Sequence, residues 1–309
     1  MAQFPMRILL VLLSVFCVTH LSWAQPEASK ATELGITLGA SSFLGELGGS
    51  ADVGRALVQD IDLAATRPAA GIFFRWNPNN RLGWRFNAYY TQVFGDDALG
   101  GATDPAQPGY ARVYRNLSFR SNIAELSTNL EINLLPYVVG SERFRFTPYL
   151  TFGVGGAYFD PRALYQGEWI RLQPLGTEGQ ALPQYPEKEK YSLVTAVFPV
   201  GAGIKFNFND SWAMTFEVSH RFTTTDYIDD VSGTYANPTF FFEEYDAATA
   251  NLVSALADRS SGEFPGRTAP GEQRGDPSDF DGYTFIGLFS LSYALKTRGN
   301  TQYYCPKFF

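Results

Sequence analysis

The sequence has few residues that bind soft metals or form disulfides. It contains two cysteines, Cys17 and Cys305, and two histidines, His20 and His220. Cys17 and His20 lie in an N-terminal segment that we predict below to be a cleaved signal peptide. The mature chain then keeps one cysteine and one histidine, which excludes an internal disulfide framework and a zinc centre. We therefore expect no cofactor.

Long apolar runs are also scarce. The run from Ile8 to Val18 follows a single charge, Arg7, and is too short for a membrane helix. No later segment approaches the roughly 18 apolar residues that such a helix requires.

The end of this run fits a processing site. Ser22-Trp23-Ala24 places small residues at the −3 and −1 positions of a signal-peptidase site, so we predict a secretory signal peptide over residues 1–24. Cys17 raises a lipoprotein alternative, which the bulky Phe16 before it disfavours.

Positive charge is in deficit. Removal of Arg7 with the signal peptide lowers the 24 basic side chains to 23, against 31 acidic ones, a formal charge of −8. This balance argues against nucleic acid as a partner. Aromatic residues, by contrast, make up 16% of the chain, and there are 29 glycines. An exported chain of this composition without a spanning helix is either a soluble β-sandwich or an outer-membrane barrel.

Period-2 alternation of apolar and polar residues predicts eight strands. Most are long enough to cross a bilayer as tilted strands, which takes about 9–11 residues, whereas sandwich strands are nearer 5–6. The predicted strands cover residues 33–43, 69–77, 81–94, 117–135, 144–159, 192–208, 212–225 and 282–296.

The connections between these strands alternate in length. Three are short and turn-like, and four are long and rich in Gly, Pro and Asp: 45–68, 95–116, 160–191 and 226–281. Both termini fall on the short side, as in outer-membrane barrels. We predict an all-β fold: an eight-stranded antiparallel up-and-down transmembrane β-barrel over residues 25–298, with four long extracellular loops, short periplasmic turns and a periplasmic C-terminal tail over 299–309. The fourth loop is expected to hold a short helix at 246–258.

The two faces of each strand differ. In the last strand Tyr283, Phe285 and Phe289 share one parity, and the apolar parity is expected to face lipid. Aromatics near the strand ends are expected in interfacial belts; they include Trp84, Tyr158, Trp212 and Tyr283.

The opposite parity is predicted to carry four acids and four bases into the lumen. Eight strands leave room only for side chains, and buried charges must be paired. We therefore predict an ion-pair network that plugs the barrel; a charge-lined channel is the alternative. The set is Glu33, Arg75, Arg85, Glu125, Glu131, Lys205, Glu217 and Arg221.

The end of the seventh strand carries a cluster of acids. Asp226, Asp229 and Asp230 could ligate a hard cation such as Ca²⁺ with help from carbonyls and hydroxyls. The alternative, which we favour, is that they bond backbone donors and organise the loop. Catalysis is not indicated, because Ser219 and His220 point to opposite faces of the wall and a triad needs contact between its members.

The tail contains Cys305, which is the one thiol of the mature chain. An unpaired cysteine in an exported protein indicates intermolecular pairing or a free reactive group. The tail either folds back into the barrel mouth or contacts a partner.

Several segments, taken in order, span nearly the whole mature chain and resemble the PorG-like outer-membrane barrel family of Bacteroidota, which is associated with the type IX protein secretion system and, in some members, with gliding. They include GIFFRWNPNNRLGWRFNAYYTQVFGDD, TPYLTFGVGGAYFDP, LQPLGTEGQ, FEVSHRFTTTDYIDDVSGTY and the terminal CPKF.

The resemblance implies an integral, non-enzymatic outer-membrane subunit that contacts lipid and anchors or scaffolds a secretion complex. The implied partners are a periplasmic ring lipoprotein and its partner protein. The fourth loop looks longer than expected for the secretion subunit. A surface-exposed binding barrel that uses its long loops, and a narrow transport barrel, are the alternative functions.

Overall fold

The structure is a computed structural model that describes residues 31–45, 47, 64–102, 104, 107, 110–264, 266–277 and 280–295. The predicted signal peptide at 1–24, the tail at 299–309 and Cys305 lie outside these residues. Within the described ranges, no helix has both the length and the apolar character needed to cross a membrane.

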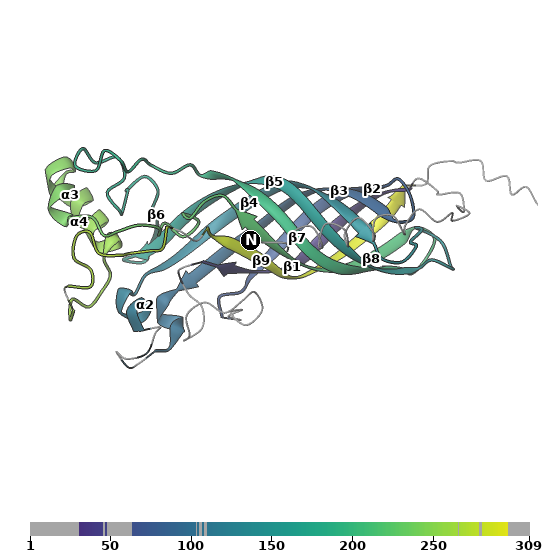
Figure 1. Ribbon diagram of the computed structural model, residues 1–309, viewed down its shortest axis with the longest axis horizontal. Coiled ribbons are helices and arrows are strands. Elements are labelled where there is room, and N and C mark those ends of the chain that lie inside the picture. The colour runs from purple at the N-terminus through teal and green to yellow at the C-terminus, as the bar shows by residue number, and fades with distance from the viewer. Residues whose placement is uncertain are drawn as a thin grey trace, which may run out of the picture.

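Eight antiparallel strands form a closed barrel (Figure 1). Each pairs with its neighbours around the ring, and pairing of the first strand with the last removes the free edges. The predicted fold is confirmed. The strands are β1 (Ala31–Leu44), β2 (Arg67–Asn77), β3 (Leu82–Asp96), β4 (Ser118–Asn133), β5 (Phe146–Tyr165), β7 (Val194–Asn207), β8 (Trp212–Thr223) and β9 (Gly282–Leu295).

The fifth strand continues beyond its predicted end at residue 159. It reaches Tyr165 and turns back into a short ninth strand, β6 (Glu168–Arg171). Gln166 and Gly167 form the turn with φ values of 49° and 89°. Positive φ at both central residues suits the right-handed twist of a two-residue hairpin. This hairpin projects above the barrel wall.

The described parts of the long loops lie at one end of the barrel and the short turns at the other (Figure 1). Among the described residues, the loop end contains four short helical elements: η1 (Asp97–Gly100), α2 (Tyr110–Arg115), α3 (Pro238–Glu244) and α4 (Ala247–Ala257). The predicted helix at 246–258 is confirmed as α4. Asp246 caps its N-terminus by accepting hydrogen bonds from the backbone N–H groups of Ala248 and Thr249.

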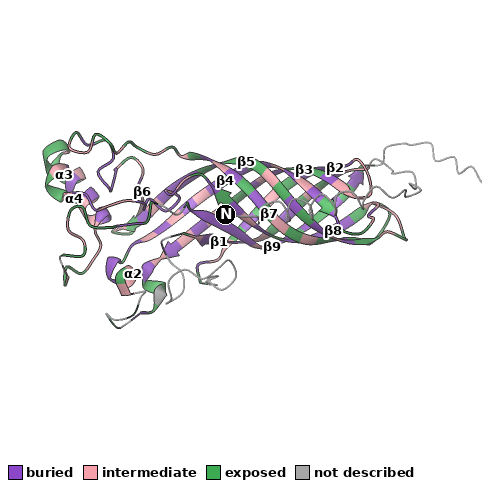
Figure 2. Cartoon of the chain, in the orientation of Figure 1, coloured by how far each residue is buried: buried purple, intermediate pink, exposed green. Residues whose placement is uncertain are grey.

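Burial alternates along the strands, because successive side chains point to opposite faces of the wall (Figure 2). In β3, Trp84 and Phe86 are 42% and 50% exposed, whereas Arg85 between them is 1% exposed. The outer wall is therefore apolar and the inner face polar. The predicted belt residues Trp84, Tyr158 and Trp212 all lie on the outside.

Tyr283 corrects the predicted parity. It and Phe285 are buried inside the barrel rather than exposed on its outer wall. The cause is a β-bulge in β9, where Ala40 pairs with Gly287 but Ser41 pairs with Phe285. The extra residue reverses the facing of every side chain on one side of it. The outward alternation holds only from Phe289 onward.

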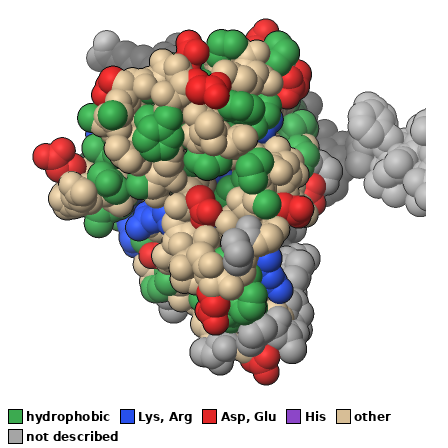
Figure 3. Space-filling view, turned by 90° about the vertical axis from the view of Figure 1, so that its left-hand side faces the viewer, with side chains coloured by type: hydrophobic (Ala, Val, Ile, Leu, Met, Phe, Trp, Pro, Cys, Tyr) green, Lys and Arg blue, Asp and Glu red, His purple; other side chains and the backbone are tan. Residues whose placement is uncertain are grey.

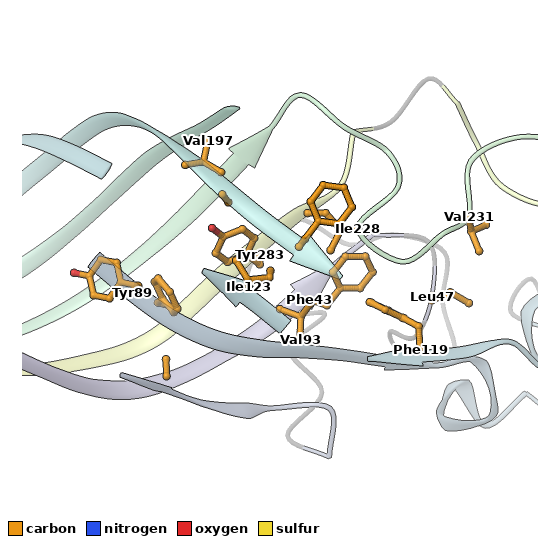
Figure 4. Close-up of a cluster of buried hydrophobic side chains, with 14 of the residues drawn as sticks. Phe43, Leu47, Tyr89, Val93, Phe119, Ile123, Val197, Ile228, Val231 and Tyr283 are labelled. Carbon is orange, nitrogen blue, oxygen red and sulfur yellow. The ribbon is translucent and has the colours of Figure 1, made fainter. Parts of the chain in front are cut away.

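An apolar cluster fills the loop-side half of the lumen (Figure 4). Phe43 and Phe119 meet edge to face with ring centroids 4.8 Å apart, and the bulge places Phe285 5.2 Å from the Tyr89 ring. These rings close the lumen from above. Other members include Val93, Ile123, Phe159, Val197, Ile228 and Val231.

Candidate functional site

The turn-side half of the lumen is filled by paired charges, with Glu131 at the centre. Its carboxylate lies 2.9 Å from the Arg75 guanidinium, 3.1 Å from that of Arg85 and 2.5 Å from the Lys205 ammonium. Arg75 also pairs with Glu33 at 3.1 Å. All of these side chains are buried. One carboxylate thus holds together cations from three strands.

The network continues toward the loops through Glu217. Its carboxylate pairs with Arg85 at 2.7 Å and accepts hydrogen bonds from Ser219 and from the Tyr149 hydroxyl, the latter at 2.6 Å. Arg221 donates to the Ser219 hydroxyl. The chain of contacts therefore connects the lower charges to the upper ones.

Glu125 ends the network below the apolar cluster. It pairs with Arg221 at 3.1 Å and accepts a hydrogen bond from the Tyr283 hydroxyl at 2.8 Å. All eight side chains predicted to share the lumen are thus brought into one connected network, with equal numbers of acids and bases. Sequence reasoning missed its neutral members. The alternation in β5 could have predicted that Tyr149 points into the lumen. The position of Tyr283 could not be predicted in this way, because the bulge in β9 reverses its parity.

Above the barrel, the long loops fold into a cap with a second buried polar centre. We call the residues Thr177, Glu178, Asp230 and Arg274 the loop staple. Arg274 donates to the Glu178 carboxylate at 3.0 Å and to the backbone carbonyl of Asp230 at 2.7 Å. Glu178 also accepts hydrogen bonds from the backbone N–H groups of Ser232 and Gly233. Loops three and four are thereby joined.

The second loop is attached to the same centre. Asp97 pairs with Arg115 at 2.9 Å, and Arg115 donates to the backbone carbonyl of Arg274 at 2.6 Å. The Gly95-Asp96-Asp97 segment at the end of β3 therefore organises contacts between loops. Figure 3 looks onto this end of the molecule, where hydrophobic and acidic side chains are scattered over the surface.

Of the three acids considered for Ca²⁺, Asp230 belongs to the loop staple. Asp230 accepts hydrogen bonds from the Thr177 and Tyr191 hydroxyls, each at 2.5 Å. Asp229 accepts one from the backbone N–H of Val231 at 2.9 Å, and Asp226 is buried. Among the described residues, no three His, Cys, Asp or Glu side chains form a group that could hold a metal ion.

Burial changes the acidity of two of these carboxyls. Removal from water raises the pKa of Asp230 to about 6, although Arg274 and the two hydroxyls oppose this effect. Burial likewise raises the pKa of Asp229 well above its usual range. Asp230 also has φ at 69°, a conformation that aspartate tolerates better than most residues. The segment that contains Asp229 and Asp230 is therefore a desolvated, conformationally constrained part of the cap.

His220 lies on the outer wall. Its Nδ1 is 2.9 Å from the Thr284 hydroxyl oxygen, and its ring packs against Phe222. Ser219 is on the other face of the wall, where it donates to Glu217. The two residues therefore do not contact each other.

An apolar groove of about 660 Å³ lies on the outer wall. It opens over Gly35, beside Leu34, Ile36, Ile72 and Phe74. These side chains belong to the apolar belt, so the groove offers no set of polar groups that would orient a soluble ligand.

A closed eight-stranded antiparallel sheet with an apolar outer wall, a polar lumen and loops sorted by length has the architecture of an outer-membrane β-barrel. The chain belongs to the family described as "Domain of unknown function (DUF6089)", which matches residues 7–242. No curated protein matches the sequence.

Similar solved structures include outer-membrane protein OprG of Pseudomonas aeruginosa, with a TM-score of 0.36, 10% identity and coverage of 87% of this chain and 99% of that one. Ail, the attachment invasion locus protein of Yersinia pestis, in complex with the heparin analogue sucrose octasulfate, has a TM-score of 0.36 and 9% identity over 86% of this chain and 99% of that one. Neisserial surface protein A has a TM-score of 0.35 and 8% identity over 86% of this chain and 97% of that one.

Proposed function

We propose that this protein is an integral outer-membrane barrel that acts without a pore and without catalysis, as an anchor for other proteins. The observation that carries the proposal is the filled lumen inside an apolar wall. Charges such as Glu131 and Arg75 are fully buried and paired, and the apolar cluster lies above them. Passage of a solute would require these pairs to separate within the barrel, which costs several kcal/mol for each.

A closed barrel leaves two surfaces for function, the face of the short turns and the loop cap. The more specific form of the proposal places the turn face in a type IX secretion complex, docked on a periplasmic ring lipoprotein and its partner. Its support is the sequence resemblance. Two of the segments that carry the resemblance, TEGQ and TDYIDDVS, contact each other through Thr177 and Asp230.

The membrane location is tested by fractionation. The mature chain should accompany the outer membrane, and its gel mobility should change on boiling, since a closed sheet resists unravelling. Recovery in the soluble periplasm would refute the proposal at its first step.

The partner is tested by native co-purification. Wild type should retain the ring lipoprotein, and deletion of 301–309 should reduce both this association and cargo secretion while barrel levels stay constant. The matched variant removes an equal length from the loop face, at 259–267. If no ring component accompanies wild type, the anchoring role is wrong. If wild type retains the ring component and deletion of 301–309 leaves association and secretion unchanged, the docking role of the tail is wrong.

One observation favours a second candidate, a surface-exposed binding barrel. Phe242 and Phe280 in the fourth loop are 50% and 66% exposed, and exposed aromatic side chains are common anchors at interfaces. Substitution of both by Ser should then abolish cell-surface binding without changing the gel mobility. A transport barrel makes a different prediction, a steady conductance in planar bilayers, which we expect to be absent.

A further inference from the structure

Three arginines lie side by side on the outer wall where it meets the loops. Arg120 in β4 is directly opposite Arg162 in β5, and Arg162 is directly opposite Arg171 in β6. Directly opposed residues share a face of the sheet, with Cβ atoms about 4.5–5.5 Å apart. We call these three residues the arginine row.

The row has more positive than negative charge. Arg162 and Arg171 both bond to Asp160, at 2.6 and 2.7 Å, and this carboxylate is 6% exposed. The two guanidiniums keep 32% and 47% of their side-chain surface exposed. Within the described chain, Asp160 is the one carboxylate that contacts the row.

Arg120 differs from the other two arginines because its guanidinium has no hydrogen-bond acceptor among the described residues. The group stacks on the Trp169 ring with its central carbon 3.8 Å from the ring centroid. Its Nε is buried and makes no hydrogen bond to any described residue. A guanidinium carries five N–H donors in a fixed fork. Stacking fixes the plane of this fork and leaves its edge available to an acceptor.

Like charges directly opposite each other in a sheet are destabilising. Arg120 and Arg162 occupy such a pair, and the Asp160 carboxylate bonds to Arg162 and Arg171. A further anion at the edge of the row would supply the acceptors that Arg120 lacks and reduce this repulsion.

The residues that lie between the arginine row and the apolar wall show where the row sits along the barrel. Below it, Gln92 donates to Asn122 at 2.8 Å, and below these amides lie Tyr90 and Tyr158, which are 58% and 44% exposed. Leu126 and the rest of the apolar wall follow. The order from lipid to loops is thus apolar, aromatic, amide and cation, which is the polarity gradient of a membrane interface.

The row is confined to one side of the barrel. Arg67 extends it past β4, because its guanidinium lies 4.3 Å from the Phe94 ring centroid and Phe94 is opposite Arg120. On the other side, the outward positions of β7 and β8 carry no lysine or arginine. The cations therefore mark a site rather than a uniform ring.

We propose that the arginine row binds the phosphate groups of glycolipid head groups in the outer leaflet. The inference rests on the proposed location in the outer membrane. Guanidinium forks match phosphate oxygens in two-point contacts, and anionic head groups attract basic side chains at this depth. The row spans roughly 10 Å from β4 to β6 at the usual strand spacing, wide enough to contact more than one phosphate oxygen. Asp160 holds two of the forks in place.

The test uses the full mature protein in nanodiscs of zwitterionic lipid. Bisphosphoryl lipid A, the same lipid with both phosphates removed, and inorganic phosphate are titrated separately, and bound lipid is counted by native mass spectrometry. Wild type should bind the phosphorylated lipid saturably. Arg120→Gln and Arg171→Gln should each weaken this binding about tenfold, the loss expected for one charge-assisted contact.

The control variant is Arg143→Gln, an exposed arginine at the turn end of the barrel, which should bind like wild type. Arg171 lies in β6, outside the closed ring, so its variant tests the site even if Arg120→Gln folds poorly. The proposal would be overturned if the dephosphorylated lipid, or inorganic phosphate alone, bound as tightly as the phosphorylated lipid. Failure of wild type to insert into nanodiscs would instead refute the membrane location.

Discussion

The Tyr283 hydroxyl donates a hydrogen bond to Glu125 at 2.8 Å inside the barrel, although alternation places this tyrosine on the outer wall. The contact exists because the bulge in β9 shifts the register between Gly287 and Phe285. It brings a phenol beneath the apolar cluster and supplies a second donor to a carboxylate that also pairs with Arg221. The bulge therefore joins the charged and apolar halves of the lumen.

Tyr283→Phe should lower the free energy of unfolding by about 2 kcal/mol, because one hydrogen bond to a buried charge is lost. Urea unfolding in detergent, followed by gel mobility, measures the change. Tyr293→Phe is the matched control, since Tyr293 is 42% exposed on the outer wall of the same strand. Equal effects of the two substitutions would contradict the lumenal role of Tyr283.

The sequence was sufficient to predict the strands and the lumenal charges, because a period of two residues assigns each side chain to a face. Glu131 and Arg85 needed no other information. The facing of Tyr283 was not predictable, since a single extra residue in one strand reverses the parity and leaves no local signal.

The loop staple could not be predicted from the sequence either, for a different reason. Glu178 and Arg274 are 96 residues apart in the chain, in loops whose paths no periodicity specifies. The segments TEGQ and TDYIDDVS could be singled out by resemblance, but their contact through Thr177 and Asp230 required the structure. The orphan guanidinium of Arg120 likewise depends on the β6 hairpin, which lies in a segment predicted to be a loop.

Glu131→Gln should destabilise the barrel strongly. Removal of this charge leaves Arg75, Arg85 and Lys205 with less compensation in the lumen, and breaking a buried pair costs about 3–5 kcal/mol. The measurement is the urea concentration at which half of the protein loses the gel mobility of the folded barrel. Glu142→Gln is the control, since its side chain is 89% exposed and surface pairs contribute little. A loss no larger than that of the control would show that the network does not stabilise the barrel.

Calcium should not stabilise the protein through Asp226, Asp229 and Asp230. The oxygens of Asp230 already accept two hydroxyl hydrogen bonds, and no described cluster of three acids could hold a metal. Addition of Ca²⁺ after treatment with a chelator should leave the melting temperature unchanged, apart from general screening. A saturable rise that disappears in Asp229→Asn, but persists in Asp246→Asn, would establish a calcium site.

The cap should lose stability as the pH rises through the range in which Asp230 ionises. Its pKa is about 6 in the folded protein against 3.8 ordinarily, because the carboxyl is buried. Between these values the folded state holds a proton that the unfolded state releases, so unfolding becomes easier as pH increases. The contribution is greatest below about pH 4, and the difference in pKa corresponds to roughly 3 kcal/mol.

Asp230→Asn removes this titration and should make the unfolding free energy fall less steeply with pH between about pH 4 and pH 7. Asp229, whose pKa is also raised by burial, keeps its own contribution in this variant. The groups around Asp230 are Thr177, Tyr191, Arg274 and Glu178, and all remain in the variant. Asp246→Asn is the opposite control, because hydrogen bonds from Thr249 lower the pKa of Asp246 and its contribution is lost as pH falls. Urea unfolding at a series of pH values compares the three proteins. Parallel profiles for wild type and Asp230→Asn would show that the buried carboxyl does not control the pH dependence of the cap.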